Sequence, residues 1–121
     1  MKRVRVKLIV RQPELKSAVG EVFSLDLAEG SSIVDAIKAL DEEIERAVGV
    51  FPVKGYEGLL HMVYHPSEER FYRQVALQAY TESGVSLNVR ANPKLALPNN
   101  TIIVLVPQGP CISEWEKTVD R

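Results

Sequence analysis

The sequence has few of the residues that build metal and redox centres. Its 121 residues include one cysteine and two histidines. A single cysteine, Cys111, excludes an internal disulfide and any zinc or iron–sulfur centre held by several cysteines of the chain. The two histidines, His61 and His65, have Glu68 and Glu69 nearby, but on a strand the histidines would lie about 13 Å apart at a rise of about 3.3 Å per residue. One ion cannot bridge that distance, so we expect no metal site and no cofactor.

Long apolar runs and excess charge are also missing. No run reaches the length of a membrane span, and residues 1–7 lack the apolar core of a signal peptide. The net charge of −1 at pH 7 gives no overall attraction to nucleic acid or to anionic membranes. No nucleophile–base motif, Walker loop or glycine-rich dinucleotide fingerprint is present. These absences predict a cytoplasmic protein that has no catalytic residues, is not an enzyme and does not bind membranes.

Near its start the sequence has a hydrophobic pattern of period two. Val4, Val6 and Leu8 alternate with Arg5 and Lys7, which predicts a strand with one apolar and one basic face. Residues 23–27 repeat the alternation, so the two strands are expected to form a hairpin with a loose connection. No aromatic residue lies between the cations, and nucleic acid binding is therefore not expected. A solvated surface is the favoured interpretation of the basic face, and a contact with an acidic protein or a phosphate backbone is the alternative.

Residues 33–48 carry the pattern of an amphipathic helix. Ser32 is a good N-cap, Asp35 stands where a carboxylate bonds back to the cap, and Gly49 is a typical C-terminal stop. The apolar residues recur at spacings of three or four, at Ile33, Ile37, Leu40, Ile44 and Val48. A single apolar stripe predicts that the helix packs on one surface, which we take to be the apolar face of the hairpin.

Residues 50–84 have no single clear pattern. A loop is predicted over 51–58 and a short strand over 59–64. Ser67, followed by two acids, is typical of a helix start, and Gly84 is the expected end of that helix. A strand is the alternative, because residues 71, 75, 77 and 79 are apolar and share one parity. Residues 85–89 alternate again and predict a further strand.

The most apolar stretch is the last predicted strand, residues 101–106. A turn at 98–100 precedes it and Pro107 ends it. Five of its six residues are Ile, Val or Leu, so neither face is polar, as in a strand with neighbours on both edges. Parallel pairing with the first strand would give it that central place. The order of the elements predicts an α+β roll.

Residues 4–49 and 85–109 resemble the ubiquitin-like β-grasp family, and in particular the small sulfur-carrier proteins of molybdopterin and thiamine synthesis. The resemblance rests on the hairpin, on the turn and helix start at 27–40, and on the closing strand with its proline at 97–107. It implies a β-grasp roll, a mixed sheet with one main helix. On this resemblance residues 1–110 form the domain, with 50–84 as a loop-and-helix insertion, and residues 111–121 form a tail.

In that family the closing strand leads to a Gly-Gly terminus whose carboxylate carries the chemistry. Here Gln108, Gly109 and Pro110 stand in that place, and the sequence continues for twelve residues after Gly109. We therefore expect no carrier chemistry at this position. Gly109 and Cys111 are the candidate tail residues, the first as a trimming point and the second as a reactive thiol. A simple turn and a passive cysteine are the favoured interpretations.

The closing strand also predicts a contact surface. If its even-numbered residues face the helix, Ile103 and Leu105 lie with Ile9 on the open face of the sheet. An uncovered apolar patch indicates a protein partner or self-association. The sequence thus predicts a non-enzymatic ubiquitin-like or sulfur-carrier-related protein that acts through protein–protein contact. The alternative is an enzyme subunit or a small-ligand-binding domain with its site in residues 50–84.

Overall fold

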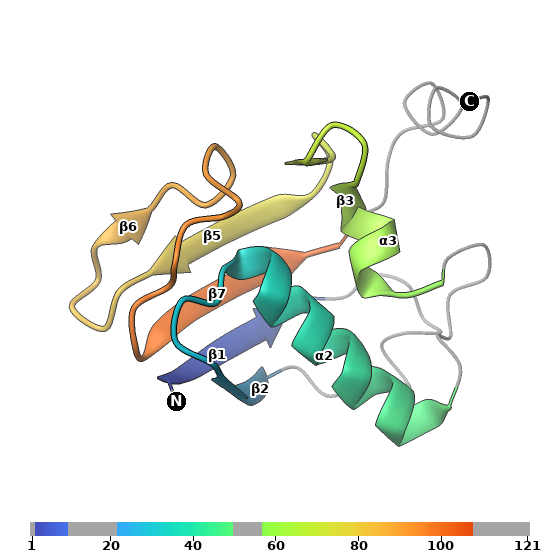
Figure 1. The fold of residues 1–121 in the computed structure, drawn as a ribbon, viewed down its shortest axis with the longest axis horizontal. Coiled ribbons are helices and arrows are strands. Elements are labelled where there is room, and N and C mark those ends of the chain that lie inside the picture. Colours follow the sequence, from blue (N-terminus) through green and yellow to red (C-terminus); the bar gives the residue numbers. More distant parts are fainter. Residues whose placement is uncertain (1, 10–21, 50–56, 108–121) are drawn as a thin grey trace.

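In the computed structural model, which describes residues 2–9, 22–49 and 57–107, a helix lies across a five-stranded sheet (Figure 1). The strands are β1 (Lys2–Leu8), β2 (Val22–Leu27), β5 (Ala76–Tyr80), β6 (Ser86–Leu87) and β7 (Thr101–Val106). Their order across the sheet is β2-β1-β7-β5-β6, with both parallel and antiparallel pairs. The predicted α+β class and the mixed sheet are therefore confirmed.

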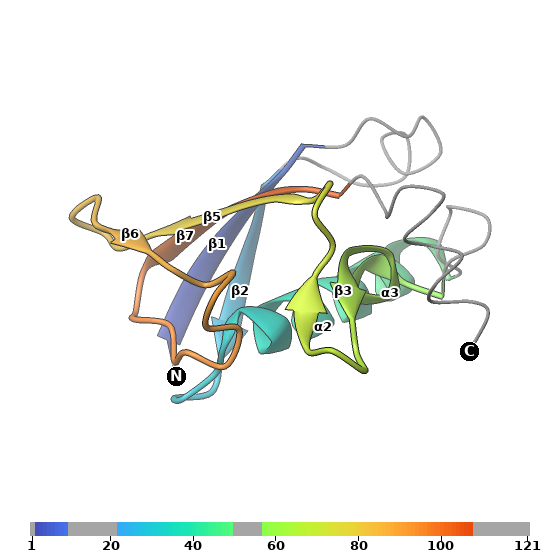
Figure 2. The same cartoon turned by 90° about the horizontal axis from the view of Figure 1, so that it is seen from above.

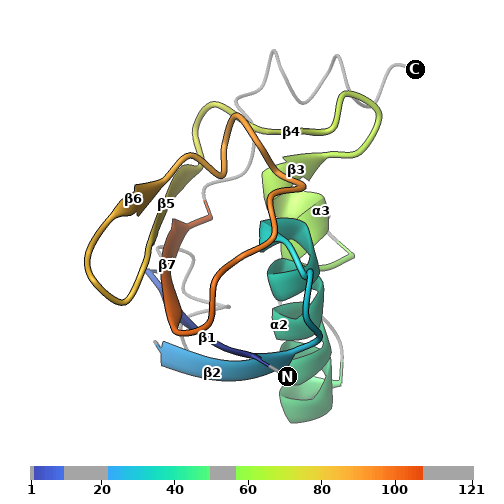
Figure 3. The ribbon, with the colours of Figure 1, turned by 60° about the vertical axis from the view of Figure 1, so that its left-hand side comes forward.

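The helices and a small ribbon form a second layer. Helix α2 (Ile33–Val48) crosses the sheet, and the short helix α3 (Leu59–Val63) contacts it. Strand β3 (Tyr64–His65) pairs with β4 (Arg70–Phe71) in a separate ribbon. Figure 2 and Figure 3 show that both helices and this ribbon lie on the same side of the sheet. Neither helix in the described residues has the length and apolar character needed to cross a membrane.

Strand β1 organises the sheet because it pairs on both edges. It pairs antiparallel with β2 and parallel with β7, so the predicted hairpin and the predicted parallel pairing are confirmed. Val4, Val6 and Leu8 are at most 1% exposed and belong to the core beneath α2. Arg5 and Lys7 alternate with them on the other face. The period of two in the sequence therefore translates directly into one buried and one open face.

Helix α2 begins and ends where its local sequence predicts. The Ser32 hydroxyl accepts a hydrogen bond from the Asp35 N–H, and the Asp35 carboxylate accepts one from the Ser32 N–H at 3.0 Å. Gly49 ends the helix with a φ of +82°, which favours glycine, and its N–H donates to the Glu45 carbonyl oxygen. The buried stripe of the helix is Ile33, Ala36, Ile37, Leu40 and Ile44. Val48, the last residue of the predicted stripe, is exposed.

Residues 59–80 differ most from the expectation drawn from the sequence. The strand predicted over 59–64 is helix α3 as far as Val63. The helix predicted from Ser67 to Gly84 is wrong: these residues form a turn, β4 and β5, so the strand alternative is confirmed at Ala76–Tyr80. Strand β5 forms because β7 has a second edge that needs a partner. Ala79 stands opposite Ile103, and the ladder satisfies backbone groups that β7 would otherwise leave unpaired. Residues 76–80 of the expected insertion therefore belong to the main sheet. The strand predicted over 85–89 is confirmed only at Ser86–Leu87.

Hydrogen bonds tie the turn before β7 to β1. The Asn100 N–H donates to the Arg3 carbonyl oxygen at 2.7 Å, and the Asn99 side-chain oxygen accepts from the Arg3 N–H at 2.8 Å. The buried Lys2 donates from Nζ to the Leu97 carbonyl oxygen at 2.5 Å. These contacts hold β7 beside β1 and set the register of the parallel pair.

Candidate functional site

The open face is the side of the sheet opposite α2. The residues that β7 places on this face are not the ones that the sequence predicts. Ile103 and Leu105 are 0% exposed and lie in the core, so their predicted place on the open face is wrong. The register gives the reason. Val6 stands opposite Ile103, and residues opposite each other in a pair of strands point to the same face. Because β1 turns its valines toward the core, the odd-numbered residues of β7 follow.

An apolar row made of Ile102, Val104 and Val106 runs along the middle of the open face. All three residues are half-buried, between β1 on one side and β5 on the other. Ile9, at the end of β1, is 42% exposed, alternates with the buried Leu8 and so lies on this face. Among the described residues no helix lies over the row, as Figure 2 and Figure 3 show.

Two cations border the apolar row on the β1 side. Arg5 and Lys7 stand opposite the first two residues of the row in the parallel pair, and both are exposed. Neither side chain makes a hydrogen bond or ion pair with another residue of the described ranges. Arg3, further along β1, is 3.3 Å from the Asp26 carboxylate, but an exposed pair of this kind adds little stability.

Polar and aromatic side chains border the row on the β5 side. Gln78 stands opposite Val104, and Tyr80 stands opposite Ile102. The Tyr80 hydroxyl donates a hydrogen bond to Gln78 Oε1 at 2.9 Å. The open face therefore has an apolar centre between a cationic edge and an amide–tyrosine edge, which matches the apolar centre and polar rim of protein contact surfaces.

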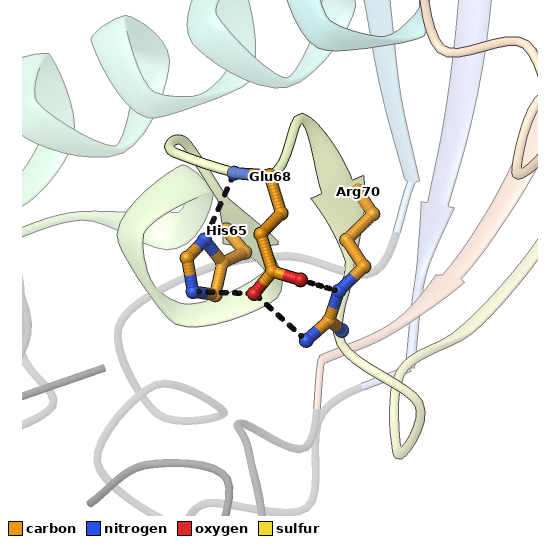
Figure 4. Close-up of polar contacts among 3 residues, drawn as sticks. All are labelled: His65, Glu68 and Arg70. Atoms are coloured by element: carbon orange, nitrogen blue, oxygen red, sulfur yellow. Dashed lines mark hydrogen bonds and ion pairs between the residues drawn. The ribbon is translucent and has the colours of Figure 1, made fainter. Parts of the chain in front are cut away.

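The two histidines make their hydrogen bonds in separate segments of the chain. His65 Nδ1 accepts a hydrogen bond from the Glu68 N–H at 3.2 Å, and its Nε2 is 3.1 Å from the Glu68 carboxylate (Figure 4). Arg70 Nε donates to the same carboxylate at 3.2 Å, so the three side chains close the turn between β3 and β4. His61 Nδ1 accepts from the Glu57 N–H at 3.0 Å. In residues 2–9, 22–49 and 57–107 no three His, Cys, Asp or Glu side chains group as metal ligands.

Asp41 of α2 positions the start of α3. Its carboxylate accepts hydrogen bonds from the N–H groups of Leu59 and Leu60, the second at 3.0 Å. The N-cap residue of α3 is Gly58, which has no side chain to do this. Burial raises the pKa of Asp41 above its ordinary value, the two amides oppose this rise, and Glu45 adds to it. Sequence reasoning missed this cap because its partners are far apart in the chain.

Two clefts share a wall formed by Leu60, Tyr64 and Pro66. The larger holds about 570 Å³ along the C-terminal half of α2, and its carboxylates are Asp41, Glu45 and Glu57. The smaller holds about 430 Å³ at the N-terminal end of α2. Both take residues from segment 50–84, where the alternative ligand site is expected, but both also need α2. The sequence alone does not indicate that these segments meet.

The candidate tail residues, Gly109 and Cys111, lie outside the described residues. Comparison with known proteins finds no matching family model, no matching curated protein and no matching solved structure. The function is therefore inferred from the residues of this chain.

Proposed function

We propose that this protein is a non-enzymatic β-grasp protein, similar to ubiquitin-like and sulfur-carrier proteins, that binds a protein partner through the open face. The topology supports the β-grasp part, since a hairpin and a crossing helix are followed by a last strand placed in parallel beside the first. The resemblance of residues 4–49 and 85–109 points the same way. The cytoplasmic location and the domain limits at residues 1–110 stay predictions.

The observation that carries the binding proposal is the apolar row beside two cations. Covering the row removes apolar surface from water, which favours association. Arg5 and Lys7 would then need carboxylates on the partner, because a charge that is buried without a counter-charge is costly. We therefore infer a partner that presents aliphatic side chains flanked by aspartate or glutamate.

Chemistry at a C-terminal glycine is not part of the proposal, because Gly109 is followed by Pro110 rather than by a second glycine. We expect the protein isolated from its native host to retain the residues after Gly109. Intact mass spectrometry measures this directly. A mass that ends at Gly109 would instead favour a carrier released by trimming.

Photo-crosslinking tests the open face. A photo-reactive amino acid at position 104 of the full chain, irradiated in an extract of the native host, is expected to give a discrete adduct. The same amino acid at the exposed position Glu42 on α2 is the matched control and should give none. The charge-reversed double variant, Arg5→Glu with Lys7→Glu, should reduce the yield of the adduct at least about tenfold, because it places like charges opposite each other across the contact.

Two further readouts make this experiment decisive. Circular dichroism should show that the charge-reversed protein is folded, since both side chains are exposed. An adduct of twice the chain mass identifies a second copy as the partner. Equal adducts from positions 104 and 42, or an adduct that the charge reversal leaves unchanged, would contradict binding through the open face.

A further inference from the structure

The smaller cleft lies where the N-terminal end of α2 meets the turn between β3 and β4. Its charged walls come from segments far apart in the chain: Lys38 from α2, Glu69 from the turn and Lys94 from the loop before β7. Tyr64 of β3 lines the cleft as well. The cleft therefore exists only in the folded protein, and it lies on the helical side of the sheet, away from the open face.

Tyr64 brings a hydroxyl group to this cleft. The residue is 8% exposed, and its ring meets Phe71 edge-on with 5.0 Å between the ring centres. In the part of the chain that the structure describes, this hydroxyl neither donates nor accepts a hydrogen bond. A hydroxyl that lines a cleft is accessible to water and to a ligand, whereas phenylalanine would fill the same space and offer no hydrogen-bonding group. Tyr64 thus supplies the cleft with a hydroxyl that can bind a ligand.

Tyr64 shares the cleft with two opposite charges, those of Glu69 and Lys94. The pKa of Tyr64 is raised, first by burial and then by the Glu69 carboxylate, while the Lys94 ammonium lowers it. Both charged groups line the cleft, and their influence falls with distance. A ligand in the cleft would therefore lie near the tyrosine and both charged side chains.

Several hydrogen-bond donors line the cleft. Lys38 is exposed, and its ammonium makes no hydrogen bond or ion pair with another described residue. The Val34 N–H lies in the first turn of α2, where N–H groups lack intrahelical acceptors and the helix dipole attracts anions. Asp35 also lines the cleft, and its Oδ2 accepts hydrogen bonds from the N–H and the hydroxyl of Ser32, at 3.0 and 3.2 Å.

We propose that this cleft binds the oxyanion of a small molecule, a carboxylate or a phosphate, through the Tyr64 hydroxyl, the Lys38 ammonium and the first turn of α2. Glu69 is 3.0 Å from Lys94, so it holds the second ammonium and competes with the ligand for it. The site goes beyond protein binding at the open face and does not depend on it. For the alternative function, that of a small-ligand-binding domain, the site specifies the chemistry of the ligand.

Amide chemical shifts of the ¹⁵N-labelled full chain test the site, with inorganic phosphate and acetate as separate probes. Sodium chloride keeps the ionic strength constant. Saturable shifts are expected at Val34, Lys38 and Glu69, with a dissociation constant on the order of 1 mM for such small probes. Tighter binding of phosphate or of acetate assigns the oxyanion class. Shifts no larger than those caused by sodium chloride, or shifts spread over the whole surface, show an adventitious ion only and overturn the proposal.

Three variants and a matched control separate ligand binding from stability. Tyr64→Phe removes only the hydroxyl, so it should weaken binding about fivefold and leave the melting temperature close to that of the wild type. Lys38→Gln should also weaken binding, whereas Lys7→Gln makes the same charge change on the open face and should not. Glu69→Gln should strengthen binding because it releases Lys94 and removes a like charge. Unchanged binding in Tyr64→Phe, or weaker binding in Glu69→Gln, would overturn the assignment.

Discussion

Leu105→Asp is expected to leave the protein unfolded at 25 °C, whereas Val104→Asp folds. Leu105 is 0% exposed and stands between Leu8 of β1 and Leu77 of β5. A carboxylate buried there without a partner costs several kcal/mol in addition to the lost packing, and the total stability of such domains is about 5–15 kcal/mol. The neighbouring Val104 points to the open face, where a new carboxylate meets water and stands opposite Lys7.

Alanine at the same two positions gives a graded form of this test. Leu105→Ala is expected to lower the free energy of unfolding by about 2–5 kcal/mol, because it leaves a cavity in the core. Val104→Ala should lower it by about 1 kcal/mol, since the residue is only half-buried. Urea denaturation followed by circular dichroism measures both values. Equal losses at the two positions would contradict the register that places Leu105 in the core.

Asp41→Ala is expected to lower the free energy of unfolding by about 1–3 kcal/mol at neutral pH. The change removes the acceptor of both the Leu59 and the Leu60 N–H groups, in a part of the structure that is largely buried. Asp41→Asn keeps one side-chain oxygen and should therefore lose less. Hydrogen exchange of the amides at residues 59–63 reports on α3 directly. Protection in Asp41→Ala equal to that of the wild type would show that another group caps this helix.

The same carboxylate makes stability depend on pH. Burial raises the pKa of Asp41 above its ordinary value of 3.8, so the folded state binds this proton more tightly than the unfolded chain. The resulting stabilisation is fully present below about pH 3.8 and is lost as the pH rises through the folded-state pKa. Relative to Asp41→Asn, the wild type should therefore lose stability across this window. Thermal unfolding at several pH values measures the difference, and parallel profiles for the two proteins would refute it.

Features with a local signal were predictable from the sequence by itself. The β1–β2 hairpin follows from the alternation of apolar and polar residues, because Arg5 and Lys7 mark the outer face of β1. The limits of α2 follow from Ser32 and Asp35, since a capping box is complete within four residues. The central place of β7 follows from its apolar composition, which only a strand with two neighbours accommodates.

The tertiary structure alone decided which face of β7 is buried, what residues 59–80 form and where ligands could bind. Both faces of β7 are apolar, so its orientation depends on the pairing of Val6 with Ile103. Strand β5 forms along the free edge of β7, and the first N–H group of α3 donates a hydrogen bond to the Asp41 carboxylate of another helix. The cleft beside Tyr64 likewise joins three distant segments. Contacts between residues far apart in the chain leave no periodic pattern in the sequence, and both candidate sites are made of such contacts.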